Sequence, residues 1–303
     1  MNHGYSYQTT LAQSEAVGWR IEDIIGGKHR LDFTKPFMPE ALAWVDRLPF
    51  LTSEEKLILN HVRGNTYLCI FGLVEEFILP FVLDHTRSQL RDDDWRVRAM
   101  LQFAGEEAKH IQLFKTFQAE FNEGFGIDCP VIGPPDQIAK AVLAHEPLAV
   151  ALAILQIEWM SQRHYVESIK DDQELDPQFT SLLKHHWLEE AQHAKLDTLM
   201  VEALADGKSE EEILKGVEGL LAIGGFLDEG LGQQVEFDMD SFMRASGRKL
   251  SDTEKEEFRR VQRQANRWTY LGSGLTHPKV LETLEGLTPK ARQRIEGVAP
   301  AFC

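Results

Sequence analysis

Residues 106–110 read EEAKH and residues 189–193 read EEAQH, and these two segments decide the fold prediction. In each segment a glutamate stands three residues before a histidine. On an α-helix such a pair lies on one face, one turn apart, so that a carboxylate oxygen and an imidazole nitrogen can reach one point. A single Glu-x-x-His segment is common on exposed helices, whereas two of them in one chain favour a shared metal site.

Each segment follows a lone glutamate that stands in an apolar stretch. Glu75 precedes Glu107 by 32 residues, and Glu158 precedes Glu190 by the same interval. Ferritin-like bundles place one glutamate on each of two helices and a Glu-x-x-His pair on each of the other two. Four carboxylates and two imidazoles neutralise two divalent cations, whereas the same groups without metal would be buried like charges at a severe cost. The repeat therefore predicts a di-iron or di-manganese centre.

His186 extends the second half of this pattern. It stands four residues before Glu190 and seven before His193, within a sector of roughly 60° on a helix that turns about 100° per residue. His186 is therefore a candidate additional ligand, and the alternative is a histidine satisfied by the protein core. The neighbouring His185 points elsewhere and is expected to be structural.

The lone glutamate of the first half has two candidates, Glu75 and Glu76. The interval of 32 residues favours Glu75. Pro80 removes the helical hydrogen bond to the carbonyl of Glu76, and the resulting distortion could turn Glu76 inward instead.

A ligating imidazole needs a partner on its other nitrogen. Each Glu-x-x-His segment is preceded by another acid, Glu106 or Glu189. We expect these acids to reach the histidines of the opposite helix, with solvated side chains as the alternative. Asp197, one turn after His193, is a further candidate for this supporting role.

Helix caps and breakers predict an all-α chain. Four bundle helices are expected within about 55–205: one or two helices from the Thr52 cap to about 84, then 94–121, 147–169 and 177–204. Accessory helices are expected in 1–54 and 206–303. The fold class is therefore a ferritin-like four-helix bundle with additional N- and C-terminal helices, in a single domain over 1–303.

Composition excludes several classes of partner. With 48 acidic and 32 basic residues, the formal charge of −16 argues against nucleic acid and anionic membranes, which need clusters of cations. The apolar run 67–83 carries Glu75, Glu76 and Pro80 and is a poor membrane span. The three cysteines are odd in number and far apart, which favours a reducing cytoplasm.

The segment HWLEEAQH at 186–193, taken with EEAKH, resembles the para-aminobenzoate N-oxygenase family of ferritin-like di-iron proteins, over about 67–204. The resemblance implies two iron ions, dioxygen as oxidant, and N-oxygenation of an amine or another oxidation of a small molecule. The iron ligands that it implies are Glu75, Glu107, His110, Glu158, His186, Glu190 and His193. The chain departs from the family at Glu106 and Glu189, where aspartate is usual. The resemblance therefore predicts the metal site better than it predicts the substrate.

Other readings stay open. An external electron donor, a reductase or ferredoxin, is inferred because the sequence holds no convincing nucleotide-binding fingerprint. A di-manganese catalase-like protein or an iron-handling protein would share this architecture, and a purely structural helical module would bind no metal. The substrate and the oligomeric state, including a homodimer, are not decided by the sequence.

Overall fold

The computed structural model describes residues 3–91 and 93–303, so that Asp92 in the predicted cap of the second bundle helix lies outside the described residues. Every regular element in these two ranges is helical. The α-helices are α1 (Tyr7–Val17), α2 (Ile21–Ile24), α3 (Glu40–Ala43), α4 (Ser53–Arg87), α5 (Asp94–Phe125), α6 (Pro135–Leu143), α7 (Pro147–His164), α8 (Pro177–Ala205), α9 (Glu210–Ser246), α10 (Asp252–Arg267), α11 (Ser273–Leu275), α12 (Pro278–Leu287) and α13 (Pro289–Val298). Two π-helical segments, Tyr165–Ile169 and Trp268–Gly272, extend α7 and α10, and a 3₁₀ turn, Ala299–Phe302, follows α13.

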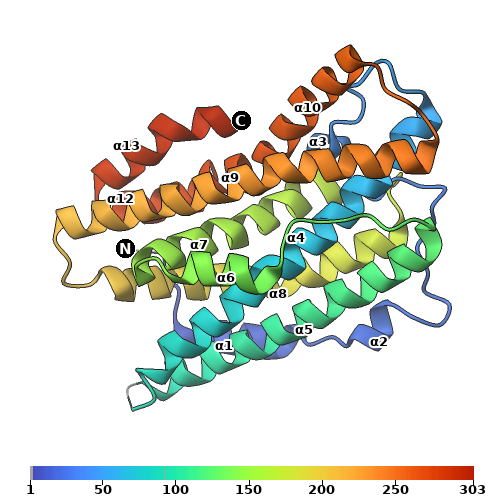
Figure 1. Ribbon diagram of the computed structural model, residues 1–303. Helices are drawn as coiled ribbons and strands as arrows, with labels where there is room; N and C mark the ends of the chain where they lie inside the picture. The colour runs from blue at the N-terminus through green and yellow to red at the C-terminus, as the bar shows by residue number, and fades with distance from the viewer. Residues whose placement is uncertain (1–2, 92) are drawn as a thin grey trace.

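The core of the molecule is a four-helix bundle of α4, α5, α7 and α8 (Figure 1). Helix α4 packs against α5 and α7 against α8, and each pair is joined by a short loop. Between the pairs, residues 126–146 form a long connection that carries α6. Two helical hairpins joined by one long crossover are the topology of a ferritin-like bundle. The predicted fold class is confirmed.

The helices begin where the sequence places caps. Before α4, the backbone N–H of Glu55 donates to the Thr52 hydroxyl at 3.3 Å, and the N–H of Thr52 donates to the Glu55 carboxylate at 2.8 Å. This reciprocal pair satisfies two N–H groups that the first helical turn leaves free. Helix α4 then continues as one helix through Pro80, so the single-helix alternative is the correct one.

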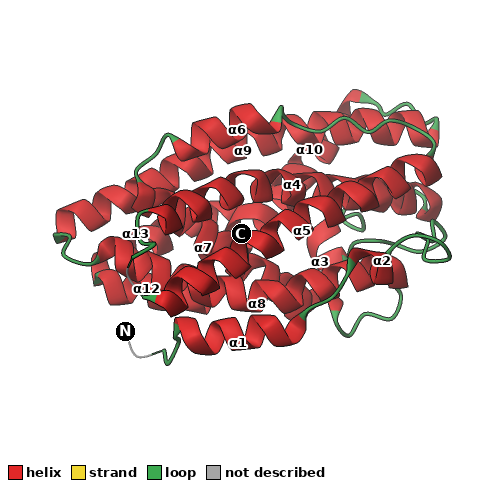
Figure 2. Cartoon of the chain, turned by 90° about the horizontal axis from the view of Figure 1, so that it is seen from below, coloured by secondary structure: helices red, strands yellow, loops and turns green. Residues whose placement is uncertain are grey.

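Helices outside the bundle cover its two opposite sides, as Figure 2 shows. Helix α1 lies against α5 and α8, and α9 lies against α4 and α7. The approach of α9 to α7 depends on glycine: a Cβ atom added at Gly216 would stand 2.8 Å from Leu148, and one at Gly219 would stand 2.6 Å from Ala149. The helices that carry the Glu-x-x-His segments therefore face α1, and those that carry the lone glutamates face α9.

Helix α4 is also long and apolar enough to cross a membrane, judged by length and composition, and it is the one such helix in the described residues. Its apolar window is 67% buried inside the protein. A helix at the centre of a bundle has this character because neighbouring helices contact it all round.

Candidate metal centre

The seven predicted ligands come from all four bundle helices, and their side chains are buried. Their exposed fractions are Glu75 2%, Glu107 0%, His110 0%, Glu158 2%, His186 3%, Glu190 1% and His193 0%. Carboxylates are almost never fully buried unless they are paired or bind a metal. The burial of so many acids in one bundle therefore requires cations.

Six of the seven residues form two overlapping groups, in which one potential ligand atom from each residue lies within 4.8 Å of the others. The first group is Glu75, His110, His186 and Glu190, and the second is Glu107, His110, Glu190 and His193. These are the groups found in residues 3–91 and 93–303. Glu190 belongs to both groups, and a carboxylate can bridge two ions, so the arrangement fits two adjacent ion positions; His110, which offers one nitrogen, can bind only one of the two ions.

Glu158 is the seventh predicted ligand, and it lies outside both groups. Its side chain is buried on α7, and its Oε2 has no hydrogen-bond partner in the part of the chain that the structure describes. A buried carboxylate oxygen without a partner is costly in the metal-free protein. The role of Glu158 as a ligand remains a prediction.

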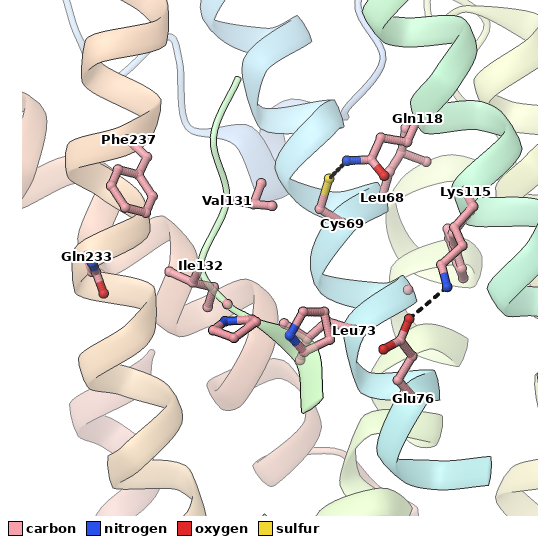
Figure 3. Close-up of a pocket in the computed structure, with 15 residues that line it drawn as sticks. Leu68, Cys69, Leu73, Glu76, Lys115, Gln118, Val131, Ile132, Gln233 and Phe237 are labelled. Atoms are coloured by element: carbon pink, nitrogen blue, oxygen red, sulfur yellow. Dashed lines mark hydrogen bonds and ion pairs between the residues drawn. The ribbon is translucent and has the colours of Figure 1, made fainter. Parts of the chain in front are cut away.

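The structure distinguishes Glu75 from Glu76. Glu75 Oε1 lies 3.2 Å from Nε2 of His186, inside the cluster. Glu76 points away from the cluster into a surface groove, where it pairs with Lys115 at 2.8 Å (Figure 3). Glu75 is therefore the glutamate that faces the cluster, and its role as a metal ligand stays a prediction. Pro80 does not turn Glu76 inward.

His186 lies within the cluster. Its Nε2 stands 3.2 Å from Glu75 Oε1 and 3.0 Å from Glu190 Oε1. Burial, and after it the charges of His110 and His193, hold the pKa of His186 well below the usual value. A neutral imidazole is the form that binds metals, so His186 has both the position and the protonation state of a ligand. His185 instead contacts the backbone carbonyl of Ser181 at 2.7 Å, which agrees with a structural role.

The two acids that precede the Glu-x-x-His pairs reach across the bundle. Nε2–H of His193 donates to Glu106 at 2.9 Å, and Nε2–H of His110 donates to Glu189 at 2.9 Å. The prediction that each acid supports the histidine of the opposite helix is confirmed. Because each acid occupies Nε2, the free nitrogen of both imidazoles is Nδ1, which points into the cluster.

The atoms that face the ion positions make close contacts that lack hydrogen-bond alignment. His110 Nδ1 lies 2.9 Å from Glu190 Oε1, and His193 Nδ1 lies 2.8 Å from Glu107 Oε1. Within the described residues, both nitrogens and all four oxygens of Glu107 and Glu190 have no hydrogen-bond partner. Lone pairs that converge on a point without bonding to one another are the arrangement of ligand atoms around a cation. The donor set therefore fits two metal ions.

Without metal, protons carry part of the required positive charge. Burial lowers the pKa of His110, but Glu189 and Glu190 outweigh burial and raise this pKa to about 9. Burial acts in the same direction on His193, and Glu190 and Glu107 raise its pKa well above the usual value. Metal binding must therefore displace protons from the cluster.

Residues of the N-terminal segment support the site from outside, and the sequence did not point to them. The Ser14 hydroxyl of α1 donates to Glu106. On α5 itself, the Lys109 ammonium of the EEAKH segment donates to Glu189. The Trp19 ring stacks on His110, with 6.1 Å between centroids and an interplanar angle of 10°. Neither Ser14 nor Trp19 belongs to a motif, so only the packing of α1 on α5 and α8 assigns them to the site.

Asp197 does not take the place expected for it. It is fully buried, but the Nε2 of His193 is bound by Glu106, and neither Asp197 oxygen has a hydrogen-bond partner in residues 3–91 and 93–303. Burial raises the pKa of Asp197 well above the usual value. The charge of His193 opposes this rise, and the charges of Glu107 and Glu190 add to it. Asp197 is therefore a buried acid beside the cluster that no hydrogen bond from the described residues holds.

A scan against protein-family models and a search of curated proteins each found no match to this sequence. Among solved structures, a mutant R2-like ligand-binding oxidase with an anaerobically reconstituted Mn/Fe cofactor is 14% identical over 92% of this chain and 95% of its own, with a TM-score of 0.47. Another mutant of this oxidase, with an aerobically reconstituted Fe/Fe cofactor, is 14% identical over 88% and 94%, with a TM-score of 0.42. This likeness is too distant to carry an argument. The fold and the site rest on the helices and side chains of the chain itself.

Proposed function

We propose that this protein is a non-haem di-iron oxidase or oxygenase that uses dioxygen to oxidise a small molecule. The observation that carries the proposal is the pair of overlapping ligand groups that share His110 and Glu190. A shared carboxylate fits two neighbouring ions better than two independent sites, and the buried acids require such ions for charge balance.

In this proposal Glu75, Glu107, His110, Glu158, His186, Glu190 and His193 hold the metal. The four glutamates balance two divalent cations, and the imidazoles add no charge once their protons are displaced. Glu106 and Glu189 keep a proton on Nε2 of each Glu-x-x-His imidazole, which fixes the ring and directs Nδ1 inward. Iron bound here would supply electrons for the reduction of dioxygen.

The surrounding protein keeps the cluster dry. Phe103 stacks on His193 with 4.1 Å between centroids, and Phe114 and Phe71 contact His186 edge-on at 5.0 Å and 5.6 Å. Aromatic side chains around a redox site lower the local dielectric and exclude water that would quench reactive species. This packing favours oxidation chemistry over the storage or release of ions.

The finer assignments also belong to the proposal. N-oxygenation of an amine is the reaction that the sequence resemblance favours, and the electrons would come from a separate reductase or ferredoxin in the cytoplasm. Carboxylate and imidazole ligands suit manganese as well as iron. A di-manganese catalase-like protein is therefore the second candidate, and an iron-handling protein the third.

The test is elemental analysis of the aerobically purified protein, followed by optical spectra during anaerobic reduction and re-exposure to dioxygen. We expect about two irons per chain and dioxygen consumption that depends on prior reduction. Glu75→Gln should reduce the metal content, whereas Glu76→Gln, one position away and outside the cluster, is the matched control and should retain it.

The alternatives give different results in the same experiment. Two manganese ions with rapid decomposition of peroxide would support the catalase-like protein. A protein without metal, in which Glu107→Ala or Glu190→Ala increases the free energy of unfolding, would support a structural module, since removal of an unneeded buried carboxylate stabilises a fold.

A further inference from the structure

A small apolar cavity lies beside the cluster, on the side of α4 and α7. Its volume is about 30 Å³, and its walls come from α4, α7, α9, the crossover and the π-helical segment that holds Tyr270. Apart from Leu227, the side chains that line it are at least nine-tenths buried. It is therefore an internal space and differs from the grooves on the surface.

Two residues of the cavity wall stand next to the lone glutamates in the sequence. Val74 lines the cavity and immediately precedes Glu75, and Ile157 lines it and immediately precedes Glu158. Phe71, one turn before Glu75, forms part of its wall and presents its ring edge-on to His186 at 5.6 Å between centroids. A molecule in the cavity would be separated from His186 by a single aromatic ring.

The chemistry of the walls selects the occupant. Water in a buried cavity needs two to four polar partners, and apolar cavities remain dry and accept apolar molecules. Tyr270 is the one polar residue in the lining, and its hydroxyl has no hydrogen-bond partner within residues 3–91 and 93–303. The volume is also far below the roughly 150 Å³ of a cavity that accepts a benzene ring.

We propose that this cavity is a holding site for dioxygen on its way to the metal centre, with Ile132 of the crossover as the barrier at its entrance. Dioxygen is apolar and small, so it satisfies both the walls and the volume. The inference rests on the proposed function, because dioxygen has a role only if the cluster reacts with it.

Ile132 has the position of a barrier. It lines the cavity and also two surface grooves, of about 380 Å³ beside α4 and α5 and about 390 Å³ beside α6 and α9. Figure 3 shows it in the first groove, on the crossover between α4 and α9. The side chain is 8% exposed and lies where the cavity meets both grooves, together with Leu73 at the first groove and Ile138 and Leu227 at the second.

The backbone around Ile132 is held by a buried glutamine. Gln234 accepts the N–H of Ile132 at 2.9 Å and donates to the carbonyl of Pro130 at 3.3 Å. These two bonds tie the crossover to α9, and the Gln234 amide also donates to Asp238, one turn further along α9, at 2.8 Å. Because the backbone is fixed, passage past Ile132 depends on rotation of its side chain.

Xenon is the probe, because it binds in dry apolar cavities and needs no metal. We expect xenon NMR and xenon-pressurised crystals of the full chain to show a bound atom beside Phe71, in both the metal-free and the iron-loaded protein. Leu231→Phe fills the cavity from α9, and we expect it to weaken xenon binding by at least about tenfold. Leu221→Phe, also on α9 but outside the cavity lining, is the matched control.

The reduced, iron-loaded protein provides the second readout. Leu231→Phe should slow dioxygen consumption at limiting dioxygen by roughly threefold or more, whereas Ile132→Ala should accelerate it, because entry and not chemistry is altered. Both variants should approach the wild-type rate at saturating dioxygen. If Leu231→Phe does not fold, Ile132→Ala, in a loop, still tests the barrier.

Two results would overturn the inference alone: no xenon beside Phe71 in a protein that holds two irons and consumes dioxygen, or a rate at limiting dioxygen that neither variant changes. A protein that binds xenon but no metal would instead overturn the proposed function, and with it the role of dioxygen in the cavity.

Discussion

On the α5 and α8 side of the cluster, His110 and His193 are each hydrogen-bonded to a glutamate of the opposite helix, and Ser14 and Lys109 bind those glutamates in turn. On the α4 and α7 side, the lone glutamates are flanked by residues that line an apolar cavity. One side of the cluster is therefore held by a polar network and the other is bounded by apolar side chains.

This difference separates two requirements of a metal site. Imidazoles held by hydrogen bonds keep their orientation whether or not a metal is bound. A carboxylate such as Glu158, with an oxygen that no described residue hydrogen-bonds, can change its position at little cost. We expect the α5 and α8 side to determine metal affinity, and the α4 and α7 side to determine how dioxygen and substrate approach.

The largest effect should come from the shared carboxylate. Glu190 belongs to both ligand groups and can bridge two ions, so Glu190→Ala should remove both metal ions, whereas His110→Ala removes the ligand of one ion. His193→Ala or Glu107→Ala removes a ligand from one group only and should empty one position first. Elemental analysis after dialysis measures this, and equal losses in all four variants would contradict the assignment of Glu190 as the shared ligand.

The supporting acids should give the next effect. Glu106→Gln and Glu189→Gln leave the ligands in place but weaken the hold on Nε2, and should lower metal affinity by about 10- to 100-fold each. Competition with a chelator measures this affinity. Glu76→Gln is again the control, and unchanged affinity in the first two variants would show that the polar network does not support the metal.

A variant of His186 tests the difference between the two sides of the cluster. Because His186 contacts Glu75 and not the supporting acids, His186→Ala should retain two irons and change the rate of the reaction with dioxygen. Stopped-flow spectra of the reduced protein measure that rate. Full metal loading with an unchanged rate would exclude His186 from the site.

A pH titration should separate the metal-free from the loaded protein. The pKa of His110 is raised to about 9 in the metal-free fold, so its stabilising contribution is complete below the unfolded value near 6.5 and is lost as pH rises through about 9. The free energy of unfolding should fall over this window by up to about 1.4 kcal/mol per pH unit in the chelator-treated protein. Metal affinity should rise over the same window, because fewer protons compete. Urea denaturation at several pH values, with and without iron, measures both trends.

The smallest effect should come from Asp197. Since the pKa of Asp197 is raised, the isosteric Asp197→Asn should change the stability of the metal-free protein by less than about 1 kcal/mol at about pH 4, where the carboxyl group is partly protonated in the unfolded chain as well. At higher pH the variant should become relatively more stable, because a raised carboxyl pKa costs stability as pH rises above the unfolded value. A large loss of metal in Asp197→Asn would instead identify Asp197 as a ligand.

The predictions from sequence that the structure supports concern residue types that recur at helical spacing. The paired Glu-x-x-His segments, the interval of 32 residues and the helix caps indicated the bundle, the preference for Glu75 and the crossed contacts of Glu106 and Glu189. Each of these depends on helical periodicity, which fixes which side chains share a face without knowledge of the fold.

The sequence by itself thus determined the helices and the inward-facing residues of each, because both follow from local periodicity and capping. Only the tertiary structure decided which residues of distant segments meet: Ser14 and Trp19 lie behind the imidazoles, and Ile132 lies between the grooves and the cavity. It also decided that no described residue hydrogen-bonds the Asp197 carboxyl group. These contacts depend on how α1, α9 and the crossover pack on the bundle, and packing is set by the shapes of many side chains at once, which no local pattern encodes.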